Sequence, residues 1–200
     1  MYVGCNLALA LMVFSTALDP YSITYAFKLT FFELSLYRPL TALLYLSRLG
    51  ILFPFHLLFS FLATSRIANQ VHPRLPDLAW FVIINIVSLM LFSSLVSNLY
   101  FYGSAFVMAM LVVWAVQHPT DRIRIPFEVY SAYFPIAYAV LMIALGSNYR
   151  NYVAGLLIGF VYGTIKNPVF VQQHGDLLPT PSFLSNYLRP PPEHVAYQPN

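Results

Sequence analysis

Long apolar stretches alternate with short polar ones along most of the chain. Six stretches have the composition of membrane-spanning helices, and they cover approximately residues 2–18, 50–68, 78–96, 100–116, 129–145 and 151–165. Proline, glycine or charged residues lie at the ends of these stretches, as is typical where a helix stops. The pattern therefore predicts an all-α polytopic membrane protein, a bundle of six transmembrane helices.

The longest polar interruption is the loop between the first and second spans, about residues 19–49. Charged side chains are interspersed there with aromatic and aliphatic ones. Because such a mixture suits neither water nor hydrocarbon, we expect amphipathic turns lying in the plane of the membrane. Tyr37 and Arg38 lie at the centre of this loop, where an arginine can extend towards lipid headgroups.

The chain divides into a membrane domain, residues 1–168, and a proline-rich tail, residues 169–200, which we expect to be flexible. Six spans place both termini on one side of the membrane. The basic residues predicted on that side are Arg66, Arg74, Arg122, Arg124, Lys166 and Arg189, against Lys28, Arg38, Arg48 and Arg150 on the other. This bias favours cytosolic termini and a cytosolic tail.

Composition supports a membrane protein and excludes several classes of function. Hydrophobic residues make up 59% of the chain and charged residues only 8%, whereas soluble domains have roughly a quarter charged residues. The net charge of +3 comes from scattered residues without a basic cluster, so no nucleic-acid partner is expected. Cys5 is the single cysteine, which excludes an intrachain disulfide, and no ligand cluster for a metal or cofactor is present.

Three glycines give the sixth span a bare edge. Gly155, Gly159 and Gly163 are spaced four residues apart, so they line one side of a helix. In a membrane, such an edge allows a neighbouring helix to approach closely. We therefore expect these glycines to be helix-packing positions.

Two side chains in the spans invite a catalytic interpretation. Ser104 follows Gly103 at the start of the fourth span, a placement that suggests a protease nucleophile, but a nucleophilic serine needs a base. The sixth span has no histidine, aspartate, glutamate or lysine between Tyr152 and Ile165, so Gly103 and Ser104 are interpreted as a degenerate protease position and no catalytic residue is assigned. His56, in the second span, is expected to be neutral and bonded to a neighbouring helix.

An ordered set of residues resembles the Derlin family. The set comprises a long first loop with Tyr37, Arg38 and Thr41, then Gly103, Ala105, Phe106, Val113, Trp114, Pro119, Ala132, Pro135, Gly155, Gly159 and Tyr162, and finally Thr180-Pro181-Ser182 in the tail. The resemblance implies a six-helix rhomboid-like fold and a pseudoprotease of the endoplasmic reticulum membrane. It also implies a role in retrotranslocating misfolded proteins for degradation.

The partners that the resemblance implies are misfolded protein substrates, a membrane RING ubiquitin ligase complex, the lipid bilayer and a cytosolic AAA ATPase. The tail motif by which many Derlins recruit the ATPase is not recognisable in residues 168–200, so that contact could be indirect. The resemblance leaves open a homo- or hetero-oligomer.

A mechanism without catalysis follows from the length of the spans. The first and sixth spans, at about 14 to 17 residues, reach about 21 to 25 Å, against roughly 30 Å of hydrocarbon. Local thinning of the bilayer relieves this mismatch. We therefore expect the first loop, with Tyr37, Arg38 and Thr41, to gate a lateral cavity in a thinned membrane. An active rhomboid-like protease and a membrane carrier or scaffold are the alternatives.

Overall fold

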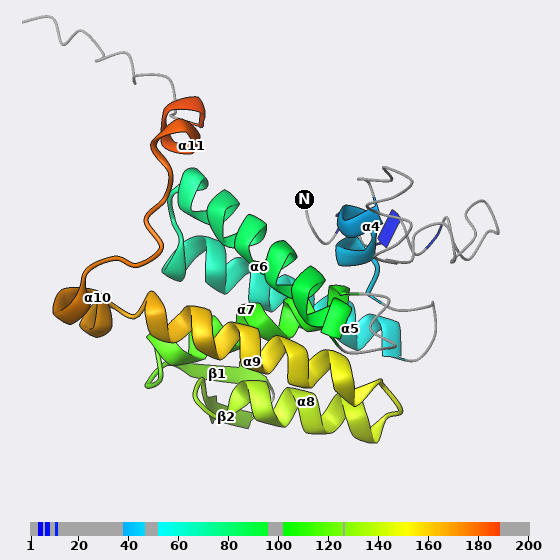
Figure 1. Cartoon of the computed structure of the whole chain (residues 1–200). Coiled ribbons are helices and arrows are strands. Elements are labelled where there is room, and N and C mark those ends of the chain that lie inside the picture. The colour runs from blue at the N-terminus through cyan, green and yellow to red at the C-terminus, as the bar shows by residue number, and fades with distance from the viewer. Residues whose placement is uncertain are drawn as a thin grey trace, which may run out of the picture.

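A computed structural model describes residues 4–5, 7–8, 11, 38–46, 52–95, 102–125 and 127–188, and most of them are helical (Figure 1). The helices are α4 (Arg38–Leu44), α5 (Leu52–Arg66), α6 (Leu75–Leu95), α7 (Gly103–Gln117), α8 (Phe134–Ala144), α9 (Tyr149–Ile165), α10 (Pro168–His174) and α11 (Ser182–Tyr187). A π-helical turn, η1 (Ile67–Val71), extends α5. Two short strands, β1 (Arg122–Ile125) and β2 (Phe127–Tyr130), pair between α7 and α8. The predicted helical class is confirmed.

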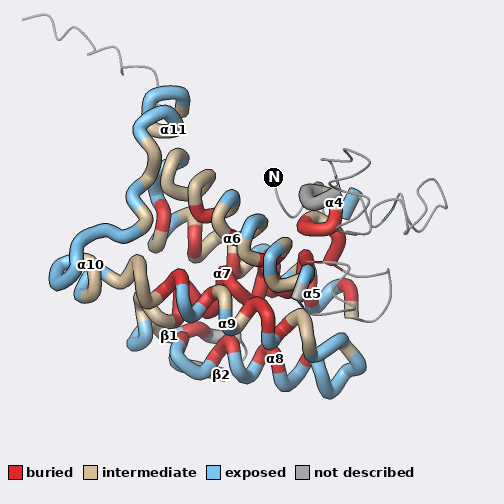
Figure 2. Tube along the Cα trace, in the orientation of Figure 1, coloured by how far each residue is buried: buried red, intermediate tan, exposed pale blue. Residues whose placement is uncertain are grey.

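Helix α7 is the centre of the bundle. All its residues from Gly103 to Ala115 are buried, and Figure 2 shows it as the continuous buried segment among partly exposed neighbours. A helix that is apolar on every side is stable only when other elements surround it. Met108 and Met110 accordingly serve as packing residues in the core.

The glycine edge of α9 lies directly against α7, as the sequence predicts. A Cβ atom added at Gly155 would lie 2.7 Å from the Cβ of Met108, and one at Gly159 would lie 2.7 Å from the carbonyl oxygen of Ala109. At Gly163 the nearest atom, the Cα of Val113, would be 3.2 Å away. Because the contacts advance together along both helices, α7 and α9 run parallel.

The β-hairpin is the main departure from the predicted elements. The sequence analysis expects a loop before a fifth span that starts near residue 129, but residues 122–130 form antiparallel strands with Arg122 opposite Tyr130. The alternation Arg-Ile-Arg-Ile in β1 has the period of a strand. Helix α8 therefore begins only at Phe134, where Pro135 lies in the first turn and costs no hydrogen bond.

Two short helices lie in the segment for which the sequence predicts a flexible tail. The side chain of Asn167 accepts a hydrogen bond from the backbone N–H of Val169 and so caps α10, with Pro168 in its first turn. Gly175 ends α10 at φ 79°, a backbone conformation that glycine adopts at little cost. The chain then returns across the bundle, and α11 contacts α6.

Among the described residues, one helix, Leu75–Ser94, is long and apolar enough to cross a membrane alone. Helices α9 and α10 give a second candidate if they count as one span bent by 54°. Most of the first predicted span, residues 2–18, and residues 97–99 between the third and fourth predicted spans lie outside the described residues. The arrangement of six crossings therefore stays a prediction.

Candidate functional site

Ser104, which the sequence analysis interprets as a degenerate protease position, is hydrogen-bonded to an amide. Its side chain is 5% exposed in the first turn of α7. The Nδ2 atom of Asn151, in the first turn of α9, donates a hydrogen bond of 2.8 Å to the Ser104 hydroxyl. A carboxamide nitrogen has no lone pair to accept a proton, so this partner does not activate the serine as a nucleophile.

An apolar groove of about 370 Å³ opens between α6 and α9. Its lining residues are Ile84 and Ser88 of α6, Leu157, Ile158, Val161, Tyr162 and Ile165 of α9, and Leu178 of the tail. Leu157 and Val161 are exposed at its edge. The groove is therefore an uncovered apolar surface between two helices.

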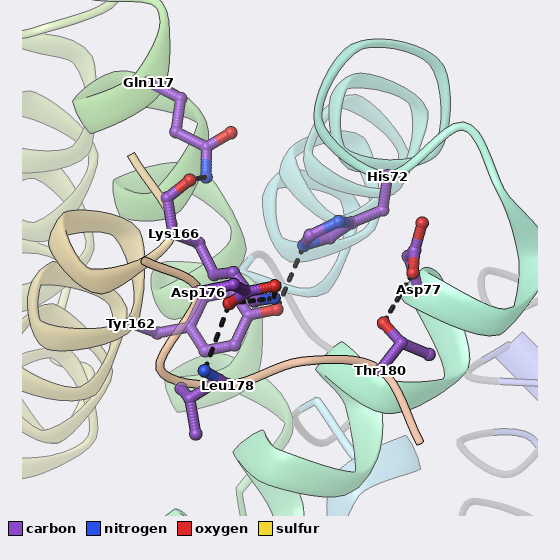
Figure 3. Close-up of polar contacts among 8 residues, drawn as sticks. All are labelled: His72, Asp77, Gln117, Tyr162, Lys166, Asp176, Leu178 and Thr180. Atoms are coloured by element: carbon purple, nitrogen blue, oxygen red, sulfur yellow. Dashed lines mark hydrogen bonds and ion pairs between the residues drawn. The ribbon is translucent and has the colours of Figure 1, made fainter. Parts of the chain in front are cut away.

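A polar pocket of about 500 Å³ lies where α9 ends and the tail begins (Figure 3). Its charged lining residues are Arg74, Asp77, Lys166 and Asp176, of which Lys166 pairs with Asp176 at 2.8 Å. Tyr162 lines both this pocket and the groove. The two spaces therefore adjoin at Tyr162.

A buried histidine forms one wall of the polar pocket. The Nε2 atom of His72 lies 3.2 Å from the Tyr162 hydroxyl, within hydrogen-bonding distance, and the imidazole is 8% exposed. Burial lowers the pKa of His72 from 6.5 to about 4, with Lys166 acting in the same direction and Asp77 against it. His72 is therefore neutral at pH 7 and links the loop before α6 to α9.

The π-helical turn η1 places His72 in this position. The backbone N–H of His72, just after the turn, donates to the carbonyl of Ile67 at its start, at 2.8 Å. Within the turn, the side chain of Gln70 accepts a hydrogen bond of 2.6 Å from the buried indole of Trp114 in α7. Such wide turns often occur at functional sites, because they shift the residues that follow.

The sequence model of the Der1-like family matches residues 1–182. The chain belongs to the Der1-like family. This membership implies a Derlin-type membrane protein of the endoplasmic reticulum, of a family that is in general rhomboid-like and non-catalytic. The resemblance to the Derlins is thereby confirmed.

The first-loop residues of this Der1-like protein are only partly described. Tyr37 lies outside the described residues, and Arg38 begins α4 with a side chain that also lies outside them. Thr41 is half-buried, and its carbonyl accepts a hydrogen bond from the Tyr45 backbone at 3.0 Å. The interfacial role expected of Tyr37 and Arg38 therefore stays a prediction.

The end of the first loop packs into the bundle. Ala42, Leu43, Tyr45 and Leu46 are buried. The backbone N–H of Tyr102 donates to Ala42 at 2.9 Å, and a Cβ at Gly103 would lie 2.8 Å from the carbonyl carbon of Tyr45. Gly103 thus has a steric role, since any side chain would push the loop away from α7.

His56 makes the contact that the sequence analysis expects. Its imidazole is 2% exposed, and its Nδ1 atom lies 3.3 Å from the hydroxyl of Tyr138 in α8. This interaction joins α5 to α8 in the membrane domain of the Der1-like protein. The expectation of a histidine bonded to a neighbouring helix is confirmed.

Sequence reasoning missed Asn151, His72 and the tail residues of the polar pocket. A signal for Asn151 was present, because it precedes Gly155 by four residues and so lies on the same face of α9. His72 and Asp176 gave no comparable signal. His72 lies in a polar segment between two predicted spans and Asp176 in the predicted flexible tail, and the pocket they line is assembled from distant parts of the chain.

Proposed function

We propose that this Der1-like protein is a non-catalytic factor of the endoplasmic reticulum membrane that assists retrotranslocation of misfolded proteins for degradation. It binds the substrate in the lateral groove between α6 and α9 and thins the bilayer around itself. The groove is the observation on which the proposal rests. It offers apolar contacts along the helices and polar contacts where it adjoins the pocket at Tyr162, a combination that suits an unfolded polypeptide with both kinds of side chain.

The lengths of the helices support the thinning mechanism. At 1.5 Å per residue, α7 with 15 residues is about 22 Å long and α8 with 11 residues about 16 Å. The hydrocarbon layer is roughly 30 Å thick. Helices this short favour a locally thinner bilayer, which lowers the barrier for a polar chain.

The bond between Asn151 and Ser104 supports a function without peptide-bond cleavage. Ser104 is buried, and its hydroxyl accepts a hydrogen bond from the amide of Asn151. An active protease would need a base at this position. Substrate is therefore held and passed on intact.

The proposed arrangement has six crossings with both termini and the tail in the cytosol. The first loop, with Tyr37, Arg38 and Thr41, then lies on the lumenal side and receives the substrate. A membrane RING ubiquitin ligase complex and a cytosolic AAA ATPase, recruited directly or through another protein, complete the pathway. The groove can also be shared with a second subunit in a homo- or hetero-oligomer.

Filling the groove tests the proposal. Ser88 lines the groove, whereas its neighbour Val87 is exposed on another face of α6. We expect Ser88→Phe to slow turnover of a misfolded lumenal reporter severalfold, because the added ring occupies the space for the substrate. Val87→Phe should leave the turnover unchanged at equal protein level. Equal turnover in both variants would contradict the groove as the substrate site.

A further inference from the structure

A short segment of the tail, residues 175–181, ties α9 to α6, and we call it the strap. Lys166 at the end of α9 donates to both carboxylate oxygens of Asp176, at 2.9 and 2.8 Å. The same carboxylate accepts a bond of 3.1 Å from the backbone N–H of Leu178. These bonds hold the first half of the strap at the polar pocket (Figure 3).

A side-chain hydrogen bond joins the second half of the strap to α6. The Thr180 hydroxyl donates to Oδ1 of Asp77 at 2.5 Å, across 103 positions of sequence. Between the two attachments, Leu178 packs against the core and lines the α6–α9 groove. The Thr180–Asp77 bond is therefore one of the two attachments that hold Leu178 in the groove.

Thr180 lies in a sequence that protein kinases can recognise. Thr180-Pro181 is the only serine or threonine followed by proline in the 200-residue sequence. Leu177 and Pro179 are exposed, and Pro181 has the extended backbone angles φ −59° and ψ 139°. An accessible, extended segment is the form in which a kinase binds its substrate.

We propose that Thr180 is a phosphorylation site whose modification releases the strap from α6. A proline-directed protein kinase would transfer the γ-phosphoryl group of ATP to the Thr180 oxygen. A P–O bond to threonine forms, the bond between the β and γ phosphates breaks, and the hydroxyl proton leaves. ADP is the other product.

Phosphorylation removes the hydrogen bond and replaces it with repulsion. The ester oxygen no longer carries the proton donated to Asp77, and close to two negative charges arrive beside that carboxylate. Of the basic residues that line the pocket, Lys166 already pairs with Asp176, and Arg74 is exposed to water. Losing a bond to a charged group shifts the ratio of docked to released strap by roughly tenfold or more.

Release would withdraw Leu178 and open the end of the groove, so that modification regulates substrate entry. This consequence rests on the proposed function and on the cytosolic orientation of the tail. The phosphorylation of Thr180 and the release of the strap do not rest on the proposed function. The two parts therefore have separate tests.

The strap is tested with the purified full-length protein in mild detergent, on a Cys5→Ser background. A nitroxide spin label on Leu177→Cys reports strap mobility without disturbing a packed side chain, because Leu177 is 58% exposed. The protein is treated with a proline-directed kinase and ATP, and the phosphorylated residue is identified by mass spectrometry. We expect phosphate on Thr180 and a rise of roughly tenfold in the ratio of mobile to immobile label.

Matched variants separate the lost bond from added charge. Thr180→Glu should mobilise the label, whereas Thr180→Ser keeps the donor and should not. Ser182→Glu adds the same charge two residues away and should leave the label immobile. Absence of phosphate on Thr180, or a phosphorylated strap as immobile as the unmodified one, would overturn the inference. If Thr180→Glu frees the strap while reporter turnover stays unchanged, the proposed groove function fails and the modification site stands.

Discussion

Asn151 decides what chemistry Ser104 can perform. The two side chains meet at 2.8 Å in a partly buried position between α7 and α9. The amide donates a hydrogen bond to the hydroxyl but cannot accept its proton, whereas an imidazole at the same place could act as a base. At this scale, the amide of Asn151 occupies the position beside Ser104 without supplying a base.

The Asn151–Ser104 bond should contribute to the stability of the bundle. We expect Asn151→Leu to lower the unfolding free energy by about 1 to 3 kcal/mol, since it leaves the buried hydroxyl without its partner. Adding Ser104→Ala should recover part of this loss. A double-mutant cycle from unfolding in detergent measures the coupling, and additive losses would contradict the bond.

His72 should give the stability a pH dependence. The pKa of His72 is 6.5 in the unfolded chain, but burial lowers it to about 4 in the folded protein. Between these two pKa values the unfolded state binds more protons than the folded state. The contribution of His72 to the unfolding free energy is therefore complete above about pH 6.5 and is lost as the pH falls towards 4. His72→Gln can still bond to Tyr162 but does not titrate. The unfolding free energy of the variant should fall less over this range; identical slopes would contradict the assignment.

At the scale of elements, the contact between α7 and α9 organises the bundle. The glycine spacing predicts from sequence that another helix packs closely against α9, because a bare helix edge has few uses other than close packing. It does not predict that this helix is α7. The sequence analysis does not predict the hairpin, because four alternating residues are too short a run to distinguish a strand from a charged loop followed by an apolar span. Likewise, the sequence analysis places Pro135 inside a fifth span of residues 129–145, because composition does not show that the helix begins at this proline.

Gly159 should tolerate even a methyl group poorly. We expect Gly159→Ala to destabilise the protein by about 1 to 3 kcal/mol, because its Cβ would lie 2.7 Å from the carbonyl oxygen of Ala109. Gly163→Ala, with its nearest atom at 3.2 Å, should cost less. Leu157→Ala, on the exposed face of the same helix, is the control. Thermal unfolding in detergent gives the order of stability of the three variants. A Gly159→Ala variant as stable as Leu157→Ala would contradict the close packing of Gly159 against α7.

At the scale of the whole molecule, the groove and the polar pocket depend on segments far apart in the sequence. Asp77 and Thr180 are separated by 103 positions, and His72 and Tyr162 by 90. Hydropathy along the chain predicts which segments are helical but not how a tail returns across them. The fold class and helix packing could therefore be predicted, whereas the groove, the pocket and the strap required the structure.

The central claim is that substrate enters the α6–α9 groove and leaves uncut. Site-specific photo-crosslinking to a misfolded lumenal reporter tests it most directly. The photoreactive residue replaces Val161 at the groove or Val140 on α8, two exposed valines on different faces. We predict crosslinks from position 161 to the full-length reporter and few from position 140. Equal crosslinking at both positions, or reporter fragments that disappear with Ser104→Ala, would contradict the account.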